Sequence, residues 1–240
     1  MFVCKIADFI VQFNNRFDYI SEMCRDYKYS GPKRAEIIVE LSEEELSRER
    51  DSSSLQYSDG YLESVCAYRK LCLQLPCKMA ILLHGSVISV ENKGIAFIAK
   101  SGVGKTTHTN LWRQYLGDKV TVINGDKPIV RILDNVPFAY GTPWAGKERM
   151  QTNSRVELTD ICIIERSEVN SVESVEPSLV VEKIMHQILR PSEAKAAINT
   201  LEIVDLLTKK CRFWVIKCNM NQDAAELAHK AIVRGNKNEA

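Results

Sequence analysis

The segment Gly94-Ile-Ala-Phe-Ile-Ala-Lys-Ser-Gly-Val-Gly-Lys-Thr-Thr107 carries the strongest fold signal in this chain. Its first half is an apolar run typical of a buried strand, and its second half is a small-residue loop that leads into a helix. In that order, successive backbone N–H groups can curl around a phosphate while the positive end of the helix dipole faces the same anion. The segment therefore predicts a phosphate-binding loop within an α/β fold.

The residues of this loop have separate expected roles. Lys105 is expected to reach the β- and γ-phosphates, and the Thr106 hydroxyl is expected to coordinate Mg²⁺. Ala99 stands where such loops usually begin with glycine, a change that costs backbone freedom but little volume. An ordinary Ser/Gly turn is the alternative, and the flanking strand and helix favour the phosphate loop. The residues assigned to nucleotide binding are Ser101, Gly102, Val103, Gly104, Lys105, Thr106 and Thr107.

A second apolar strand, over residues 119–124, ends in Asn-Gly-Asp-Lys-Pro. A carboxylate at such a strand end can hold Mg²⁺ or its water ligands beside a phosphate loop. We therefore predict that Asp126 shares the metal with Thr106. A plain Asp-Lys-Pro turn is the alternative, because Asp and Pro both favour turns.

The overall composition limits the classes of protein to consider. The 240 residues are 45% hydrophobic and 26% charged, which is an ordinary globular mixture. There are 32 Lys and Arg against 31 Asp and Glu, so no global basic field suggests a nucleic-acid partner. No apolar run is long enough to span a membrane, and the charges at Lys5 and Asp8 make a poor signal peptide. We therefore expect a cytoplasmic protein that binds neither nucleic acid nor membrane.

The eight cysteines include no Cys-x-x-Cys pair. Without a signal peptide, they are expected to be reduced and mostly buried thiols. A metal cluster formed by Cys66, Cys72 and Cys77 is the alternative.

Periodicity and turn signals divide the chain into two predicted units. Residues 1–58 are expected to form a small α+β unit, and residues 59–240 a nucleotide-binding domain with a mixed sheet. In the first unit we expect a strand over 4–13, a helix over 16–27, a strand over 36–41 and a solvated connection over 42–54 that contacts no core. In the second we expect strands over 80–84, 87–91, 94–99, 119–124, 129–133, 138–140, 160–165 and 213–218. We expect helices over 59–75, 179–189, 192–210 and 223–233, and another that follows the glycine loop and ends at about residue 116.

Motifs around the loop resemble a known kinase family. His84-Gly85 precedes the loop, residues 99–106 match Gly-x-Ser-Gly-x-Gly-Lys-Ser/Thr apart from Ala99, and Gly125-Asp126 matches an acidic pair in part. In these features, residues 80–153 resemble the kinase domain of HPr kinase/phosphorylase, whose fold is similar to the nucleotide-binding part of PEP carboxykinase. The resemblance implies a mixed-sheet P-loop domain of that type, with ATP and Mg²⁺ as cofactors.

Further motifs extend the resemblance over nearly the whole chain. They are Asn-x-Asp-Lys-Pro at 124–128, Gly-Thr-Pro-Trp-x-Gly-Lys at 141–147 and Arg190-Pro191. The chain looks like a group of bacterial proteins described as HPr-kinase-like or serine-kinase-like. The signature at the C-terminus of the characterised kinases is not found, so protein HPr is not implied as the target.

One departure concerns the acidic pair itself. Gly125 stands where the family has the first Asp, and in the family the pair supports both proton abstraction and metal binding. Asp126 alone would then perform one of these tasks. His84 is a candidate for the other, because an imidazole can accept a proton near neutral pH.

The segment over residues 141–149 carries cations that could stabilise the transferred phosphoryl group. Lys147 and Arg149 could neutralise its charge, and Asn153 could position the hydroxyl of a substrate. An exposed loop with ordinary surface cations is the alternative. Arg190 could reach back to a phosphate, or it could simply cap the helix that it ends. His108 is expected on a helix surface.

These features predict an ATP- and Mg²⁺-dependent kinase that transfers a γ-phosphoryl group to a hydroxyl of a small molecule or to a Ser of a peptide or protein. The predicted catalytic residues are His84, Lys105, Asp126, Lys147 and Arg149. The alternative, favoured by Gly125, is a nucleotide-binding regulatory or peptide-handling module without turnover. PEP carboxykinase activity is disfavoured because that family's extended signatures are absent. The partners are a nucleotide and an unidentified hydroxyl acceptor, and the sequence leaves a homo-oligomer open.

Overall fold

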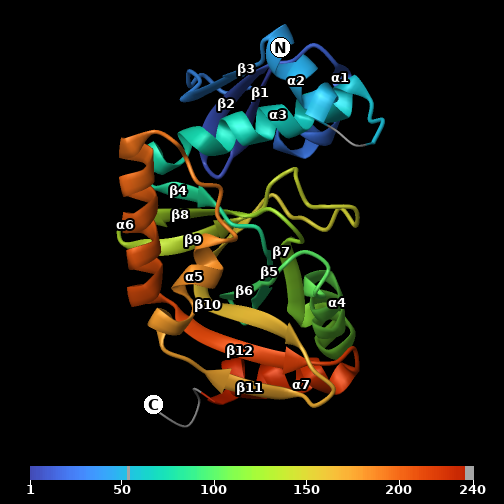
Figure 1. The fold of residues 1–240 in the computed structure, drawn as a ribbon, viewed down its shortest axis with the longest axis vertical. Helices are drawn as coiled ribbons and strands as arrows, with labels where there is room; N and C mark the ends of the chain where they lie inside the picture. Colours follow the sequence, from blue (N-terminus) through green and yellow to red (C-terminus); the bar gives the residue numbers. More distant parts are fainter. Residues whose placement is uncertain (53–54, 236–240) are drawn as a thin grey trace.

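The structure is a computed structural model that describes residues 1–52 and 55–235 (Figure 1). It contains a sheet of three strands near the N-terminus and a larger mixed sheet of nine strands. Helices cover both sheets. The mixed α/β class expected from the sequence is therefore confirmed.

The small sheet begins with a hairpin. Strands β1 (Phe2–Ile6) and β2 (Phe9–Asn14) pair antiparallel, and β3 (Ile37–Glu40) pairs parallel with β2. The single strand predicted over residues 4–13 is wrong. The turn residues Ala7 and Asp8 have φ values of 51° and 62°, the left-handed pair typical of a two-residue hairpin turn. Such turns usually contain Gly or Asn, so this one gave a weak sequence signal.

The segment after β3 forms a helix that contacts the core. Helix α2 (Glu43–Ser52) begins with a capping box, because Ser42 Oγ accepts the Glu45 N–H while Glu45 Oε2 accepts the Ser42 N–H. Leu46 is only 2% exposed. The prediction of a solvated connection without core contact is therefore wrong, and its last two residues, 53 and 54, lie outside the described residues.

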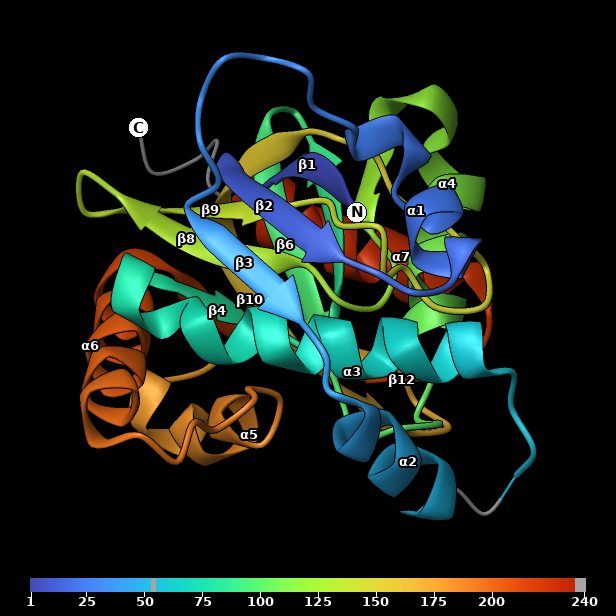
Figure 2. The same cartoon turned by 90° about the horizontal axis from the view of Figure 1, so that it is seen from above.

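Helix α3 (Asp59–Gln74) joins the two predicted units. Figure 2 shows it passing beside β3, where Lys70 and Gln74 donate hydrogen bonds to main-chain carbonyls of that strand. Its buried residues share one core with β1, β2 and β3 and with Tyr140 and Trp144 of the second unit. The boundary between residues 58 and 59 stays a prediction, and the core is continuous across it.

The large sheet follows one path of seven strands with two more attached to it. In spatial order the path is β4 (Ala80–Leu82), β8 (Ile129–Leu133), β9 (Val136–Tyr140), β10 (Arg155–Arg166), β6 (Lys93–Ile98), β5 (Ser86–Val90) and β7 (Val120–Asn124). Strand β12 (Arg212–Cys218) pairs parallel with β10, and β11 (Ser171–Ser174), which the sequence did not predict, pairs antiparallel with β12.

Two short connections join the opposite ends of this path. Residues 83–85 lead from β4 to β5, and residues 125–128 lead from β7 to β8. They lie side by side, because the Leu83 N–H donates to the Pro128 carbonyl at 3.1 Å and the Gly85 N–H donates to the Asp126 carbonyl at 3.0 Å. The sheet is therefore curled, and its two ends meet at these connections.

Helices cover both faces of the strands around β10. Its Ile161 and Ile163 join a core with α5 (Val181–Met185) and α6 (Ala194–Lys210), whereas Cys162 and Ile164 join another with α4 and α7. Helix α4 spans Lys105–Leu116, and helix α7 spans Gln222–His229 with a π-helical extension over Lys230–Arg234. The helix predicted over residues 179–189 is shorter than expected.

His108 faces the sheet and not the solvent. It is 1% exposed, and the Trp112 indole N–H donates to His108 Nε2 at 3.0 Å. Burial lowers the pKa of His108 to about 4. The predicted surface position is therefore wrong, because its place on α4 turns the imidazole toward Phe97 of β6.

The described residues contain neither a membrane-spanning helix nor a cluster of metal-binding side chains. Over 1–52 and 55–235, none of the helices combines the length and apolar character that crossing a membrane requires. Within the same ranges, no three His, Cys, Asp or Glu side chains are grouped so that they could hold a metal ion. The alternative cluster of Cys66, Cys72 and Cys77 is not formed, and all three are free thiols.

Candidate functional site

A cavity of about 590 Å³ lies beside the two connections that join the ends of the sheet. Its wall is made by the segments that follow β4, β6, β7 and β9 and by the first turns of α4. The predicted site residues that line it are His84, Ser101, Gly102, Gly104, Lys105, Thr106, Thr107, Asp126 and Lys147. Residues from four separate segments of the sequence are thus brought to one space.

The predicted phosphate loop, over residues 99–107, has a backbone that requires glycine at two positions. Gly102 and Gly104 have φ values of 77° and 128°, which L side chains rarely adopt. Arg166, at the end of β10, donates from Nε to the Val103 carbonyl at 3.0 Å and from Nη2 to the Gly102 carbonyl. These two carbonyls are therefore held by a side chain that does not line the cavity.

Lys105 lies at the base of the loop. Its ammonium donates to the Ala99 carbonyl at 3.1 Å, and the residue is only 9% exposed. Burial lowers the pKa of Lys105, and the charge of Asp126 opposes that shift. A desolvated ammonium with one backbone partner is well placed to bind an anion that enters the cavity.

Asp126 lies between two cationic or ionisable side chains. Its Oδ1 is 3.4 Å from His84 Nε2, and its Oδ2 is 3.3 Å from Lys127 Nζ. Burial favours the neutral carboxylic acid, but the contacts with His84 and Lys127 outweigh it and lower the pKa of Asp126. The group is therefore a carboxylate at neutral pH.

Asn124 is a site-forming residue whose role the sequence analysis missed. It is fully buried, and its Oδ1 accepts the N–H groups of Asp126 at 2.9 Å and Lys127 at 2.7 Å. Its Nδ2 donates to the carbonyl and hydroxyl oxygens of Thr142 at 3.0 and 3.1 Å. One amide thus fixes both the turn that presents Asp126 and the start of the loop over residues 141–150. The tendency of Asn to bond the backbone two residues ahead was the available signal.

The loop over residues 141–150 is anchored on helix α3. Trp144 is 7% exposed, its indole N–H donates to the Ser64 carbonyl of α3 at 3.2 Å, and its ring lies 4.5 Å from that of Tyr68. Further along, a Cβ atom added to Gly146 would lie 3.1 Å from the Cβ of Asp126. The loop therefore passes directly against Asp126 before it presents Lys147 to the cavity.

Gln187 is a second residue that the sequence analysis missed. It follows α5 and is 9% exposed, and its carbonyl accepts the His84 N–H at 2.7 Å. Its side-chain nitrogen faces the carbonyls of Ala99 and His84, at 3.2 and 3.3 Å, in the orientation that these two acceptors assign. No local sequence pattern identifies such a contact.

Four predicted residues do not line the cavity: Val103, Arg149, Asn153 and Arg190. Asn153 Nδ2 donates to the Asp26 carbonyl in the N-terminal unit at 2.8 Å, and Arg190 lies 3.3 Å from His186 Nδ1. Arg149 is exposed in a left-handed conformation, with a φ of 48°. The structure thus gives Asn153 and Arg190 contacts elsewhere and leaves Arg149 outside the wall.

The oxygen donors in the cavity fit Mg²⁺. The Thr106 hydroxyl and the Asp126 carboxylate line the same space, and hard oxygen ligands are what this cation prefers. Mg²⁺ is commonly held by one or two protein oxygens together with phosphate oxygens and water. The residues present therefore suit a cation that arrives with a phosphate ligand.

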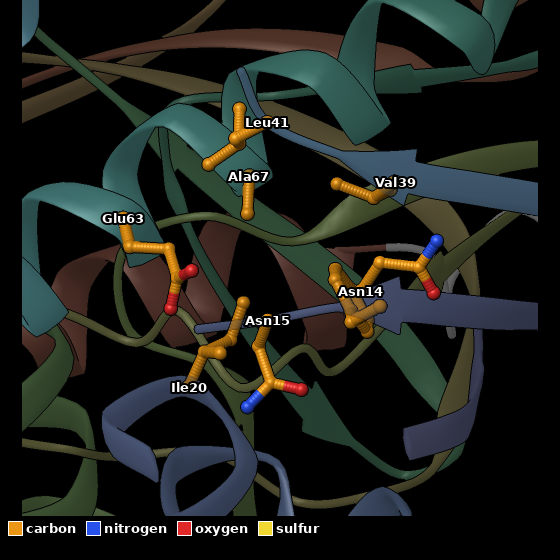
Figure 3. Close-up of a pocket in the computed structure, with 8 residues that line it drawn as sticks. Asn14, Asn15, Ile20, Val39, Leu41, Glu63 and Ala67 are labelled. Atoms are coloured by element: carbon orange, nitrogen blue, oxygen red, sulfur yellow. The ribbon is translucent and has the colours of Figure 1, made fainter. Parts of the chain in front are cut away.

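A second, much smaller cavity lies between the first 41 residues and helix α3 (Figure 3). Its volume is about 10 Å³, and Asn15, Ile20, Leu41, Glu63 and Ala67 are among its lining residues. That is about the room that one water molecule needs. It cannot hold a substrate, whereas the large cavity brings together nine of the predicted site residues.

Comparisons with known proteins do not establish a family. No family model matches the chain, and no curated protein matches it. Among solved structures, the chain is similar to the Hpr(Ser) kinase/phosphatase from Coxiella burnetii, with 9% sequence identity and a TM-score of 0.41. That match covers 66% of this chain and 91% of the other. A likeness this low assigns no activity.

Proposed function

We propose that this protein binds a nucleoside triphosphate with Mg²⁺ in the large cavity and transfers its γ-phosphoryl group to a hydroxyl acceptor. One observation carries the proposal: Lys105, Thr106 and Asp126 line a single cavity, although β5 lies between β6, which leads into the loop, and β7, which leads to Asp126. A phosphate-binding loop, a buried ammonium and a carboxylate are the parts that phosphoryl transfer requires.

Binding would begin with the exchange of one partner of Lys105. Its ammonium would leave the Ala99 carbonyl, 3.1 Å away, for the β- and γ-phosphate oxygens. The phosphate charges would offset the burial that lowers the pKa of Lys105. Lys147, which also lines the cavity, would neutralise charge on the transferred group.

His84 is better suited than Asp126 to accept the proton of the acceptor hydroxyl. A carboxylate whose pKa is lowered is a weak base, so Asp126 fits the metal-binding role. His84 lines the cavity, and the Asp126 carboxylate beside it would stabilise the imidazolium. In this reaction the acceptor oxygen bonds to the γ-phosphorus, the bond to the β–γ bridging oxygen breaks, and the hydroxyl proton passes to His84.

A second candidate is a nucleotide-binding module that does not turn over. The observation that favours it is the space around Gly125, where a Cβ atom would lie 3.3 Å from the Met150 carbonyl oxygen and 3.4 Å from that of Ala145. A second acidic side chain at this position would require the neighbouring loop to shift. The backbone is thus fitted to glycine where the resembling kinases carry an Asp.

Calorimetry and a phosphotransfer screen together test the proposal. Mg²⁺-ATP is titrated into the wild type and into Lys105→Ala, and a library of metabolites and peptides is screened for an ATP-dependent mass gain of one phosphate. We expect the wild type to bind and to label at least one acceptor, and Lys105→Ala to do neither. Absence of binding at millimolar nucleotide would overturn the proposal. Binding without hydrolysis or any labelled acceptor would favour the module.

A further inference from the structure

We propose that Gln187 is a positioning residue of this site, which fixes His84 against the phosphate loop and keeps the Ala99 carbonyl hydrogen-bonded when Lys105 leaves it. The inference rests on the proposed function and deepens it. It states why Lys105 can leave the Ala99 carbonyl without leaving that buried acceptor unsatisfied. It assigns a role at this site to the segment after α5, where the sequence had pointed to Arg190.

Gln187 contacts both main-chain polar groups of His84, the N–H and the carbonyl. Its carbonyl accepts the His84 N–H at 2.7 Å, and its side-chain nitrogen lies 3.3 Å from the His84 carbonyl. Because both groups belong to one buried residue, the main chain of His84 cannot shift without breaking two hydrogen bonds. The imidazole, 3.4 Å from Asp126, is thereby held in the cavity wall.

The same side-chain nitrogen also reaches the phosphate loop. It lies 3.2 Å from the Ala99 carbonyl, and Lys105 Nζ donates to the same carbonyl at 3.1 Å. Ala99 is 6% exposed, so water has little access to this carbonyl. One buried acceptor is therefore shared by the Gln187 amide and the Lys105 ammonium.

This sharing affects the free energy of nucleotide binding. A buried carbonyl that loses its last donor carries the free-energy penalty of an unsatisfied acceptor. With Gln187 present, Ala99 retains a partner in both states of Lys105, so that cost does not oppose binding. Without the Gln187 amide, Lys105 would be the remaining donor that the structure gives this carbonyl, and its departure would leave the carbonyl unsatisfied.

The test compares Gln187→Met with a variant on the same segment that contacts nothing in the site. Gln187→Met keeps the length and volume of the side chain but donates no hydrogen bond. Glu182→Gln is the control, because its carboxylate is exposed and pairs with His186, which does not line the cavity. Mg²⁺-ATP affinity is measured by calorimetry for folded protein. We expect roughly 5- to 100-fold weaker binding for Gln187→Met and no change for Glu182→Gln.

A double-mutant cycle tests the shared carbonyl without nucleotide. Lys105→Met and Gln187→Met each leave one donor on Ala99, whereas the double variant leaves neither. We expect the double variant to lose more free energy of unfolding than the two single losses summed. Additive losses would contradict the sharing. If Gln187→Met does not fold, Gln187→Asn, which keeps the amide on a shorter side chain, replaces it in both experiments.

The outcomes separate this inference from the function on which it rests. If the wild type binds Mg²⁺-ATP and Gln187→Met binds it equally well, the positioning role is wrong and the proposed function stands. A thermally weakened Gln187→Met with unchanged affinity would indicate a structural role only. If the wild type binds no nucleotide, the proposed function fails, and the positioning role fails with it.

Discussion

His84 Nε2 lies 3.4 Å from Asp126 Oδ1, although the two residues follow strands at opposite ends of the sheet path. The Gly85 N–H, which donates to the Asp126 carbonyl, fixes the same relationship through the main chain. The pair therefore depends on the curling of the whole sheet and not on a local turn. Both residues face the cavity that contains the phosphate loop.

Replacing Asp126 by Asn is expected to weaken only the Mg²⁺-dependent part of nucleotide binding. The amide is similar in shape but carries no charge for the cation. We expect Mg²⁺-ATP affinity to fall roughly 10- to 100-fold, and ATP affinity in the presence of a chelator to stay unchanged. Calorimetry with and without Mg²⁺ measures both. An equal loss under the two conditions would show that Asp126 acts on the loop and not through the metal.

Restoring an acidic pair at Gly125 distinguishes a kinase from a non-catalytic module. Gly125→Ala and Gly125→Asp both add a Cβ atom 3.3 Å from the Met150 carbonyl oxygen, so both displace the loop by a few tenths of an ångström. Only Gly125→Asp adds a carboxylate. If the protein is a module that is inactive because it lacks this Asp, ATP hydrolysis should appear in Gly125→Asp and not in Gly125→Ala. For a kinase adapted to glycine, both variants should fall below the wild-type rate.

Gly146 is expected to control the position of Asp126. Its φ is 75°, and a Cβ atom there would lie 3.1 Å from the Cβ of Asp126. Gly117 provides a matched comparison, because its φ is 57° and a Cβ atom there would meet nothing within 4 Å. Alanine at either position costs about 1–2 kcal/mol of backbone strain. Only Gly146→Ala should also weaken Mg²⁺-ATP binding, and equal affinities in the two variants would argue against this role.

His108 should make the stability of the protein depend on pH. Burial lowers its pKa from 6.5 to about 4, so between these values the unfolded chain binds a proton that the folded protein does not. Stability contributed by the neutral imidazole is therefore lost as the pH falls through this window. His108→Gln is the reference, because its amide oxygen can still accept from Trp112. Relative to it, the wild-type free energy of unfolding should fall on the order of 3 kcal/mol across the window.

Urea titrations at several pH values between 7 and 4 measure this difference. Parallel pH profiles for wild type and His108→Gln would show that His108 does not titrate with folding.

The sequence predicted the side of the site formed by the glycine loop because the signal of that loop is local. A strand, a glycine loop and a helix follow one another directly, and the structure has β6, the loop and α4 in that order. Likewise, Asp126 stands at the end of β7, and it lines the same cavity as Thr106.

The rest of the site could not be predicted because it depends on contacts between distant segments. Gln187 reaches Ala99 and His84 from the segment after α5, and Asn124 at the end of β7 reaches Thr142 after β9. Loop 141–150 contained plausible cations, but only its anchoring decides that Lys147 lines the cavity and Arg149 does not. Elements with weak turn signals, such as the hairpin at Ala7-Asp8, were missed for a local reason.

The insertion of Trp144 into the core formed with α3 and the small sheet limits how this protein can change over evolution. An exchange of residues 1–74, which form the small sheet and α3, must retain a space for the indole and a carbonyl that accepts its N–H. Otherwise the segment that carries Lys147 loses its support. Substitutions in the first part of the chain and substitutions in residues 141–150 should therefore covary among related proteins.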